Sequence, residues 1–534
     1  MRKIELFDTT LRDGSQGAGI SFSVEDSLKI AKVLDEFGMH YIEGGWPGSN
    51  PKAEEFFNLA KKIKFKNSKL VAFGSTRHKS QAAAQDKNLL AIVNSGVPVA
   101  CIFGKTWDLH VKYALNATLD ENLDMISDSV AFLKKRGLEV VYDAEHFFDG
   151  YINNPEYALK TLDAASCAGA QTLCLCETNG GMLPNIVCDI VRKVAKVFPN
   201  IKLGIHTHND SDCAVANSIV AVQEGCSMVQ GTVNGLGERC GNANLMSIIP
   251  ALQLKLGMQC VKPEKLIKLT ELALYVDEIA NIAPNDRQPY VGRNAFAHKA
   301  GIHVSAVAKN SKTYEHITPL EVGNERKVLV SELSGRSNLA FKAKEFSLNF
   351  DKDPKAAASI IKLVKDYEKI GYQFEDAEAS FILLAQKELG RYKPSFILKS
   401  FKVSVEIDAR GNLVSEASVK IDVNGKEEHC VAEGDGPVNA LDNSLRKALR
   451  KHYPQIDEVT LVDFKVRVIN SGAGTASKVR TFVESRDANS MWGTVGVSEN
   501  IIEASWEALA DALEYKIMKT NLSKRKKIGG KNAQ

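Results

Sequence analysis

Two histidines, His206 and His208, stand one residue apart in the segment GIHTHND. Residues i and i+2 of a β-strand point to the same face, so the two imidazole rings can offer their nitrogens to one metal ion. A pair of core histidines with satisfied hydrogen bonds fits the same spacing, which alone does not decide between the two. Asp13 favours the metal, because a carboxylate with two imidazoles suits a divalent ion that keeps open positions for a substrate.

Three further polar residues are candidates for the same site as Asp13, His206 and His208. Arg12 precedes Asp13, and its permanently charged guanidinium can clamp an anion or polarise a carbonyl group. Glu43, after a later apolar segment, is its predicted ion-pair partner. Asn242 lies in NGLGERCGNANL, whose glycines do not have the spacing of a dinucleotide fingerprint. Asn242 either adds a carbonyl ligand to the metal or is a turn residue beside a glycine.

The first half of the chain alternates short apolar runs with longer helical patterns, which is typical of parallel βα units. We predict eight strands between Lys3 and Asn234, at KIELFD, YIEGGW, KLVAFGS, VACIFGK, EVVYDAE, TLCLCET, KLGIHTH and MVQGTVN. Eight units in about 250 residues match a (β/α)₈ TIM barrel better than an open doubly wound sheet. Barrel closure would bring Asp13 next to the seventh and eighth strands. Polar residues stand at or just after the carboxyl ends of the strands, where barrel active sites lie: Asp8, Glu43, Arg77, Lys105, Glu145, Glu177, Thr178, His206 and His208.

The rest of the chain indicates two further parts. From residue 261 to residue 399 the amphipathic periodicity is mainly helical, which indicates linker subdomains. From residue 400 the apolar period changes to two, and NALDNSLRKAL and NIIEASWEALA repeat a pattern at an offset of 61 residues. We therefore predict an α/β chain with a TIM barrel in residues 1–260, helical linker subdomains in 261–399, an α+β domain of two βββα halves in 400–520 and a disordered basic tail in 521–534.

Composition argues against several classes of protein. Lys and Arg total 68 against 65 Asp and Glu, so the net charge of +3 gives no electrostatic basis for a nucleic-acid partner. No apolar run approaches membrane-spanning length, and the N-terminal segment lacks the apolar stretch of a secretion signal. The ten cysteines show no regular spacing, and we interpret them as reduced thiols of a cytoplasmic protein.

Seven motifs together resemble the α-isopropylmalate, homocitrate and citramalate synthase family: DTTLRDGSQ, IEGGWPGSNP, YDAEHFFDG, ETNGG, HTHND, GLGERCGNANL and AFAHKAGIHVSA. The resemblance implies a Claisen-type condensation, in which the methyl carbon of acetyl-CoA attacks the keto carbon of a 2-oxo acid and thioester hydrolysis releases CoA. The wording of the motifs favours pyruvate as that acid. The nearest alternative is 2-oxoisovalerate, the substrate of 2-isopropylmalate synthases, and a metal-dependent acyl-CoA lyase or aldolase reaction comes after it.

The resemblance also implies roles for individual residues. It implies four ligands for a divalent Mg²⁺, Mn²⁺ or Zn²⁺ ion, namely Asp13, His206, His208 and Asn242. It implies three catalytic residues: Arg12 to stabilise the developing alkoxide, Glu145 to remove the methyl proton and His303 to transfer a proton or activate water. It implies substrate contacts from Arg12, Thr178 and Tyr314. Glu177 departs from the family, in which many relatives carry Asp before this threonine, and the extra methylene bears on where Thr178 lies.

The resemblance gives the C-terminal domain a regulatory role. It implies that this domain forms a homodimer and binds isoleucine, the end product of the pathway. The loop SGAGTAS at residues 471–477 is a candidate part of that pocket. It further implies that the linker of one subunit covers the barrel of its partner.

Overall fold

The computed structural model describes residues 2–329, 354–407, 409–469, 474 and 476–529 of the chain. The chain forms two compact units, of which the first comprises Met1–Phe296 and Glu315–Arg326 and the second comprises Ala297–Tyr314 and Lys327–Gln534. The domain boundaries that we place at residues 260, 399 and 520 remain predictions. Within the described residues, no helix combines the length and the apolar composition that a membrane span requires.

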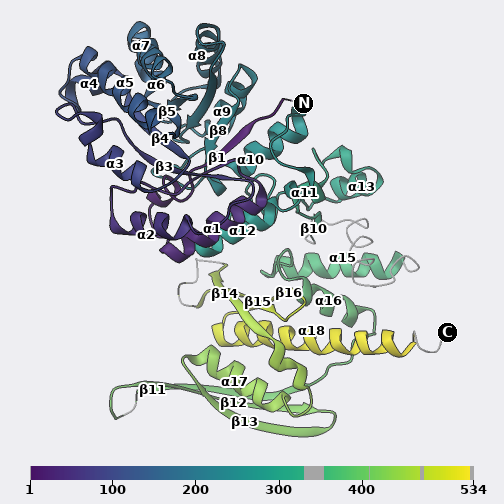
Figure 1. The fold of residues 1–534 in the computed structure, drawn as a ribbon. Helices are drawn as coiled ribbons and strands as arrows, with labels where there is room; N and C mark the ends of the chain where they lie inside the picture. The colour runs from purple at the N-terminus through teal and green to yellow at the C-terminus, as the bar shows by residue number, and fades with distance from the viewer. Residues whose placement is uncertain (1, 330–353, 408, 470–473, 475, 530–534) are drawn as a thin grey trace. The chain divides into compact units, whose positions relative to one another are not determined.

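Eight parallel strands close into a barrel in the first unit (Figure 1). Each strand pairs with the next one along the chain, and the eighth pairs with the first. The strands are β1 (Glu5–Asp8), β2 (Tyr41–Glu43), β3 (Lys69–Ser75), β4 (Val99–Lys105), β5 (Glu139–Glu145), β6 (Thr172–Glu177), β7 (Lys202–Thr207) and β8 (Met228–Gly231). The predicted TIM barrel is therefore confirmed, and all eight strands lie within the segments predicted for them.

Helices connect the successive strands of the barrel. The longer ones are α1 (Val24–Phe37), α2 (Pro51–Ala60), α3 (Lys87–Asn94), α5 (Leu119–Lys135), α7 (Pro155–Cys167), α8 (Pro184–Val197) and α9 (Ala214–Gln223). In α1, Ser23 and Asp26 form a capping box at the first turn, and Gly38 ends the helix in the left-handed conformation with φ 105°. The apolar face of α1 is buried in the barrel core through Ile30 and Leu34. Local sequence thus determines both the ends and the orientation of this helix.

Side chains fill the interior of the barrel, as in other barrels of eight strands. The apolar part of this packed layer consists of Phe7, Tyr41, Val71, Phe73, Val99, Cys101, Val141, Cys174, Cys176 and Met228. Three polar residues of the barrel strands are also buried: Asp143 is 4 % exposed, His206 is 5 % exposed and Gln230 is 0 % exposed. Because buried polar groups need hydrogen-bond partners, these three residues indicate a built polar site.

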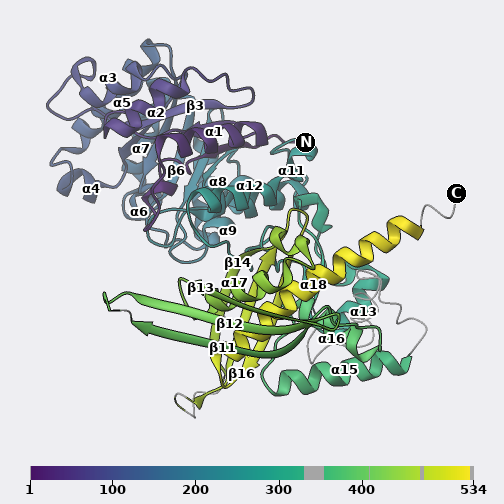
Figure 2. The ribbon, with the colours of Figure 1, turned by 90° about the horizontal axis from the view of Figure 1, so that it is seen from below.

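The second unit contains the two predicted βββα halves (Figure 2). In each half, a three-stranded antiparallel sheet packs against its own helix. The first half is β11 (Ile397–Ile407), β12 (Leu413–Val423), β13 (Lys426–Gly434) and α17 (Pro437–Leu449), and the second is β14 (Thr460–Val468), β15 (Val479–Arg486), β16 (Met491–Ser498) and α18 (Ile501–Gly529). This arrangement confirms the predicted α+β fold. The predicted tail of residues 521–534 overlaps the end of α18, and residues 530–534 lie outside the described residues.

Further helices belong to the predicted linker region. In the first unit, α11 (Pro263–Leu266) and α12 (Leu269–Ile279) follow the barrel, and α12 packs against α1. In the second unit, α13 (Gly301–Lys309) follows the short strand β9 (Ala297–His298) and precedes β10 (Lys327–Val328) in the chain. The two short strands pair with each other. Helices α15 (Pro354–Lys369) and α16 (Glu378–Glu388) share an apolar core, and α16 also packs against α18. In residues 261–329 and 354–399, the described parts of the linker region, helices predominate over strands, as the periodicity predicted.

Candidate active site

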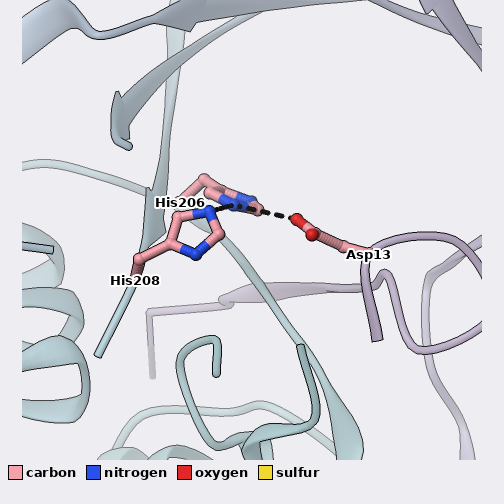
Figure 3. Close-up of side chains that lie close together, drawn as sticks. All are labelled: Asp13, His206 and His208. Carbon is pink, nitrogen blue, oxygen red and sulfur yellow. Dashed lines mark hydrogen bonds and ion pairs between the residues drawn. The ribbon is translucent and has the colours of Figure 1, made fainter. Parts of the chain in front are cut away.

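Asp13, His206 and His208 converge at the carboxyl end of the barrel (Figure 3). Asp13 follows β1, and the histidines lie on and just after β7, with only β8 between these two strands. His206 Nε2 lies 3.3 Å from Asp13 Oδ2 and 3.3 Å from His208 Nε2. One ligand atom from each residue lies within 4.8 Å of the other two. The closed barrel thus brings Asp13 to two histidines that lie about 190 positions further along the chain.

The protonation of this set suits a divalent cation. Burial lowers the pKa of His206, but the hydrogen bond and the negative charge of Asp13 outweigh burial and raise it. Burial and the charge of His206 lower the pKa of His208 to about 3. Burial would raise the pKa of Asp13, but the charge of Arg12 and the hydrogen bond of His206 hold it well below its usual range. The set therefore contains a charged carboxylate, Asp13, and a neutral imidazole, His208, and both are forms that ligate a divalent cation.

An unpartnered polar atom gives a second indication that these residues fit a metal. Asn242 Oδ1 is buried and has no hydrogen-bond partner among the described residues. Asn242 forms an isolated bridge with His208, and its Nδ2 donates to the carbonyl oxygen of Leu236 at 3.2 Å, which leaves its Oδ1 without a donor. A Cβ atom at Gly237 would lie 2.2 Å from Asn242 Nδ2, so glycine is needed there for the close approach of the loop.

Arg12 is held in place on three sides. Its Nε donates to Glu43 Oε2 at 2.7 Å, its Nη1 lies 3.3 Å from Asp13 Oδ2, and its guanidinium carbon lies 3.8 Å from the centre of the Phe73 ring. Glu43 is fully buried, and burial raises its pKa to about 7 in spite of the charge of Arg12. Breaking such a buried pair by removing one partner costs about 3–5 kcal/mol. The pair therefore fixes a cation beside the metal-ligand set.

A cavity of about 530 Å³ opens beside these residues, a size typical of small-molecule sites. Its polar lining includes Arg12, Asp13, Asp143, Glu145, Thr178, His206 and His208. One wall is aromatic, with the Trp46 ring centred 5.7 Å from Phe73 and 5.8 Å from Phe103. Phe73 and Phe103 stack at 5.5 Å. The cavity therefore offers a charged end near Arg12 and an apolar wall next to it.

Glu145 and Thr178 both line this cavity. Glu145 ends β5 and forms an ion pair with Lys105 at the end of β4. Thr178 Oγ1 accepts a hydrogen bond from the backbone N–H of His146 at 2.9 Å, so its own hydroxyl hydrogen is available to another acceptor. His146 does not continue the strand. It takes the left-handed conformation with φ 57° and caps the short helix α6 (Phe147–Asn153), and its ring packs against that of His110.

The remaining predicted residues have other surroundings. Glu177 Oε1 accepts a hydrogen bond from the backbone N–H of Gly181 at 3.1 Å, and burial raises the pKa of Glu177 to about 7. Asp8 bonds to the hydroxyl of Thr10 at 2.9 Å. Arg77 pairs with Asp128 at 2.7 Å.

His303 and Tyr314 belong to the second unit. His303 lies on α13, and its ring is centred 4.2 Å from that of Tyr314. Tyr314 is 47 % exposed, so the described residues leave part of this ring pair uncovered. Their predicted roles at a barrel mouth remain predictions.

Asp143 and Gln230 are two candidates that the sequence did not single out. His206 Nδ1 lies 2.9 Å from Gln230 Oε1, and Gln230 Nε2 donates to Asp143 Oδ1 at 2.8 Å. Gln230 could have been found because it is a polar residue in the otherwise apolar strand segment MVQG. Asp143 could have been found because it stands two residues before Glu145 and so faces the same side of the strand.

Comparison with known proteins covers nearly the whole chain. The family model described as HMGL-like matches residues 3–274, the one described as homocitrate synthase post-HMGL domain-like matches residues 290–372, and the one described as LeuA allosteric (dimerisation) domain matches residues 375–517. The chain is 54 % identical to the (R)-citramalate synthase of Aquifex aeolicus over 97 % of this chain and 98 % of that one. It is 46 % identical to the (R)-citramalate synthase of Sulfolobus acidocaldarius over 99 % of both chains.

A 2-isopropylmalate synthase of Methanocaldococcus jannaschii is 30 % identical over 96 % of this chain and 94 % of that one. The chain is thus more similar to these two citramalate synthases than to this 2-isopropylmalate synthase. The residues of the motifs favoured the same group. The chain therefore belongs to the α-isopropylmalate, homocitrate and citramalate synthase family, and within it to the (R)-citramalate synthases.

Proposed function

We propose that the protein condenses acetyl-CoA with pyruvate and water to give (R)-citramalate and free CoA. A carbon–carbon bond forms between the acetyl methyl carbon and the keto carbon, and water then cleaves the thioester. The observation that carries this proposal is the convergence of Asp13, His206 and His208 beside Arg12 in one cavity. The names of the full-length relatives support the choice of product.

Asp13, His206, His208 and Asn242 would hold a divalent ion, which would supply Lewis-acid polarisation of the keto group of pyruvate. Both nitrogen and oxygen ligands are present, which admits Mg²⁺, Mn²⁺ or Zn²⁺. Arg12, fixed by Glu43, places a permanent positive charge where the keto oxygen becomes an alkoxide. Thr178 can donate its free hydroxyl hydrogen to the carboxylate of pyruvate.

Glu145 is the proposed base that removes a proton from the acetyl methyl group. It lines the same cavity as the metal-ligand set and forms an ion pair with Lys105 at the end of the neighbouring strand. A carboxylate positioned in this way is one of the side chains that commonly act as a general base.

The aromatic wall is the proposed limit on the size of the 2-oxo acid. Trp46, Phe73 and Phe103 contact one another in a cluster, and Phe73 also lies against the guanidinium of Arg12. With the keto oxygen at Arg12, the side chain of the 2-oxo acid is proposed to lie against these rings, where a methyl group needs less space than an isopropyl group. Pyruvate is therefore favoured over 2-oxoisovalerate.

We also propose that the protein acts as a homodimer that isoleucine inhibits. The match to an allosteric dimerisation domain supports this proposal. The sheets of the two halves carry exposed apolar side chains that a partner subunit would cover, among them Ile397, Val405, Ile407, Leu413, Leu461 and Val468. In such a dimer, His303 and Tyr314 are proposed to act at the barrel mouth of the partner. Most of the loop at residues 471–477 lies outside the described residues.

The proposed location is the cytoplasm. Supporting this proposal, all ten cysteines are free thiols, and six of them are buried: Cys101, Cys174, Cys176, Cys226, Cys260 and Cys430.

A panel of 2-oxo acids tests the proposed function. Release of free CoA from acetyl-CoA is measured with each acid, with and without isoleucine. Pyruvate is expected to turn over faster than 2-oxoisovalerate, and isoleucine is expected to slow the pyruvate reaction. Turnover of 2-oxoisovalerate at a rate equal to or above that of pyruvate would replace this proposal by 2-isopropylmalate synthase activity.

A further inference from the structure

Gln230 and Asp143 form a buried hydrogen-bonded chain that ends on His206. Gln230 lies directly beside His206, because these two residues are paired in the register of β7 and β8. Asp143 lies on β5, which is not a neighbour of β8 in the barrel, so the contact between Gln230 and Asp143 crosses the barrel interior. The side chains of all three residues are buried, and their contacts measure 2.9 Å and 2.8 Å.

Asp143 determines which way the amide of Gln230 faces. A carboxylate oxygen accepts hydrogen bonds, so the amide nitrogen of Gln230 turns toward Asp143 and the amide oxygen turns toward His206. An amide oxygen only accepts, and therefore the hydrogen between Gln230 and His206 must lie on His206 Nδ1. In a neutral imidazole this arrangement leaves the lone pair on Nε2, which is the nitrogen that faces Asp13 and His208.

We infer that Gln230 and Asp143 are positioning residues that select the tautomer and the ring orientation of His206 required for metal binding. This inference rests on the proposed metal site. Ligating histidines in metal sites are oriented by a partner on their second ring nitrogen, and loss of such a partner costs about 10- to 100-fold in metal affinity. The partner here is an amide whose direction is itself fixed by a carboxylate from across the barrel.

The test is calorimetric titration of Mn²⁺ into the metal-stripped full-length protein and into variants whose folding is checked by circular dichroism. Gln230→Met keeps the size of the side chain and removes the acceptor, and it is expected to weaken Mn²⁺ binding by about 10- to 100-fold. Gln230→Glu keeps an acceptor for the Nδ1 hydrogen and can share one proton with the facing carboxylate of Asp143, so its affinity is expected to stay close to that of the unchanged protein. Thr172→Val is the matched control, because Thr172 is a fully buried polar residue of the same barrel whose hydroxyl has no partner among the described residues.

The outcomes separate this inference from the proposed function. Absence of a stoichiometric Mn²⁺ site in the unchanged protein, or its persistence in His206→Ala, would overturn the metal site itself. A normal metal site together with unchanged affinity in folded Gln230→Met would overturn only the positioning role. If Gln230→Met does not fold, a loss of affinity in folded Gln230→Glu as large as that in His206→Ala would overturn it as well.

Discussion

Replacing His206 by alanine is expected to lower kcat/KM with pyruvate by about 10³-fold or more, while the protein stays folded. Loss of this ligand removes metal-based charge stabilisation worth several kcal/mol, and each 1.36 kcal/mol corresponds to a tenfold change in rate. The variant is assayed by release of CoA, with and without a chelator, and its folding is followed by thermal unfolding. The remaining activity is expected to be insensitive to added metal.

His40→Ala provides the matched control for His206→Ala. His40 belongs to the same barrel, but it precedes β2 and therefore lies at the end opposite the cavity, where its Nδ1 accepts a hydrogen bond from the backbone N–H of Leu6 at 3.1 Å. Its loss is expected to reduce stability, by about 1–3 kcal/mol, and to leave turnover unchanged. A His206→Ala variant that stays fully active and resists chelators would refute the metal assignment.

Replacing Glu145 by glutamine is expected to lower the rate of condensation by about 10²- to 10⁴-fold, the usual contribution of a general base. Glutamine has the same shape but cannot accept the methyl proton, so pyruvate should still bind with nearly unchanged affinity. The step itself is measured by incubating the protein with acetyl-CoA in deuterated water and following deuterium uptake into the acetyl methyl group by mass spectrometry. Uptake is expected to stop in the variant.

Glu139→Gln is the control for Glu145→Gln, because Glu139 begins the same strand and is also paired with a lysine, Lys69, at 2.5 Å. It lies at the opposite end of the barrel from the cavity, and its loss is expected to leave deuterium exchange intact. Unchanged exchange in Glu145→Gln would assign the proton transfer to another residue.

The barrel and most of its mouth were predictable because they depend on local patterns. Mainly apolar runs mark the strands, which are three to seven residues long, and the carboxyl ends of parallel strands meet at one mouth of the barrel. The positions of Asp13, His206 and His208 follow from the strand order alone, since barrel closure places β1 next to β8 and β8 next to β7. The pairing of Arg12 with Glu43 likewise follows from the neighbouring positions of β1 and β2.

Other features depend on contacts that no local pattern contains. Gln230 and Asp143 meet because the barrel has a particular diameter and shear, which bring two non-neighbouring strands within hydrogen-bond distance across the interior. Another such feature is the end of β5. The left-handed backbone of His146 ends the strand there, whereas the alternation of side chains along a continued strand would have turned the His146 ring to the opposite face. The predicted roles of His303 and Tyr314 rest on the family resemblance, and neither a local pattern nor a contact within their own unit determines them.

The most direct test of a pyruvate-binding metal centre is the rate of CoA release from acetyl-CoA and pyruvate by the metal-stripped full-length protein, before and after Mn²⁺ is restored. Release is expected at the background rate of thioester hydrolysis before restoration. After restoration, CoA and citramalate are expected in equal amounts. The same rate before and after restoration, or release of CoA without citramalate, would contradict the proposed role of Asp13, His206 and His208.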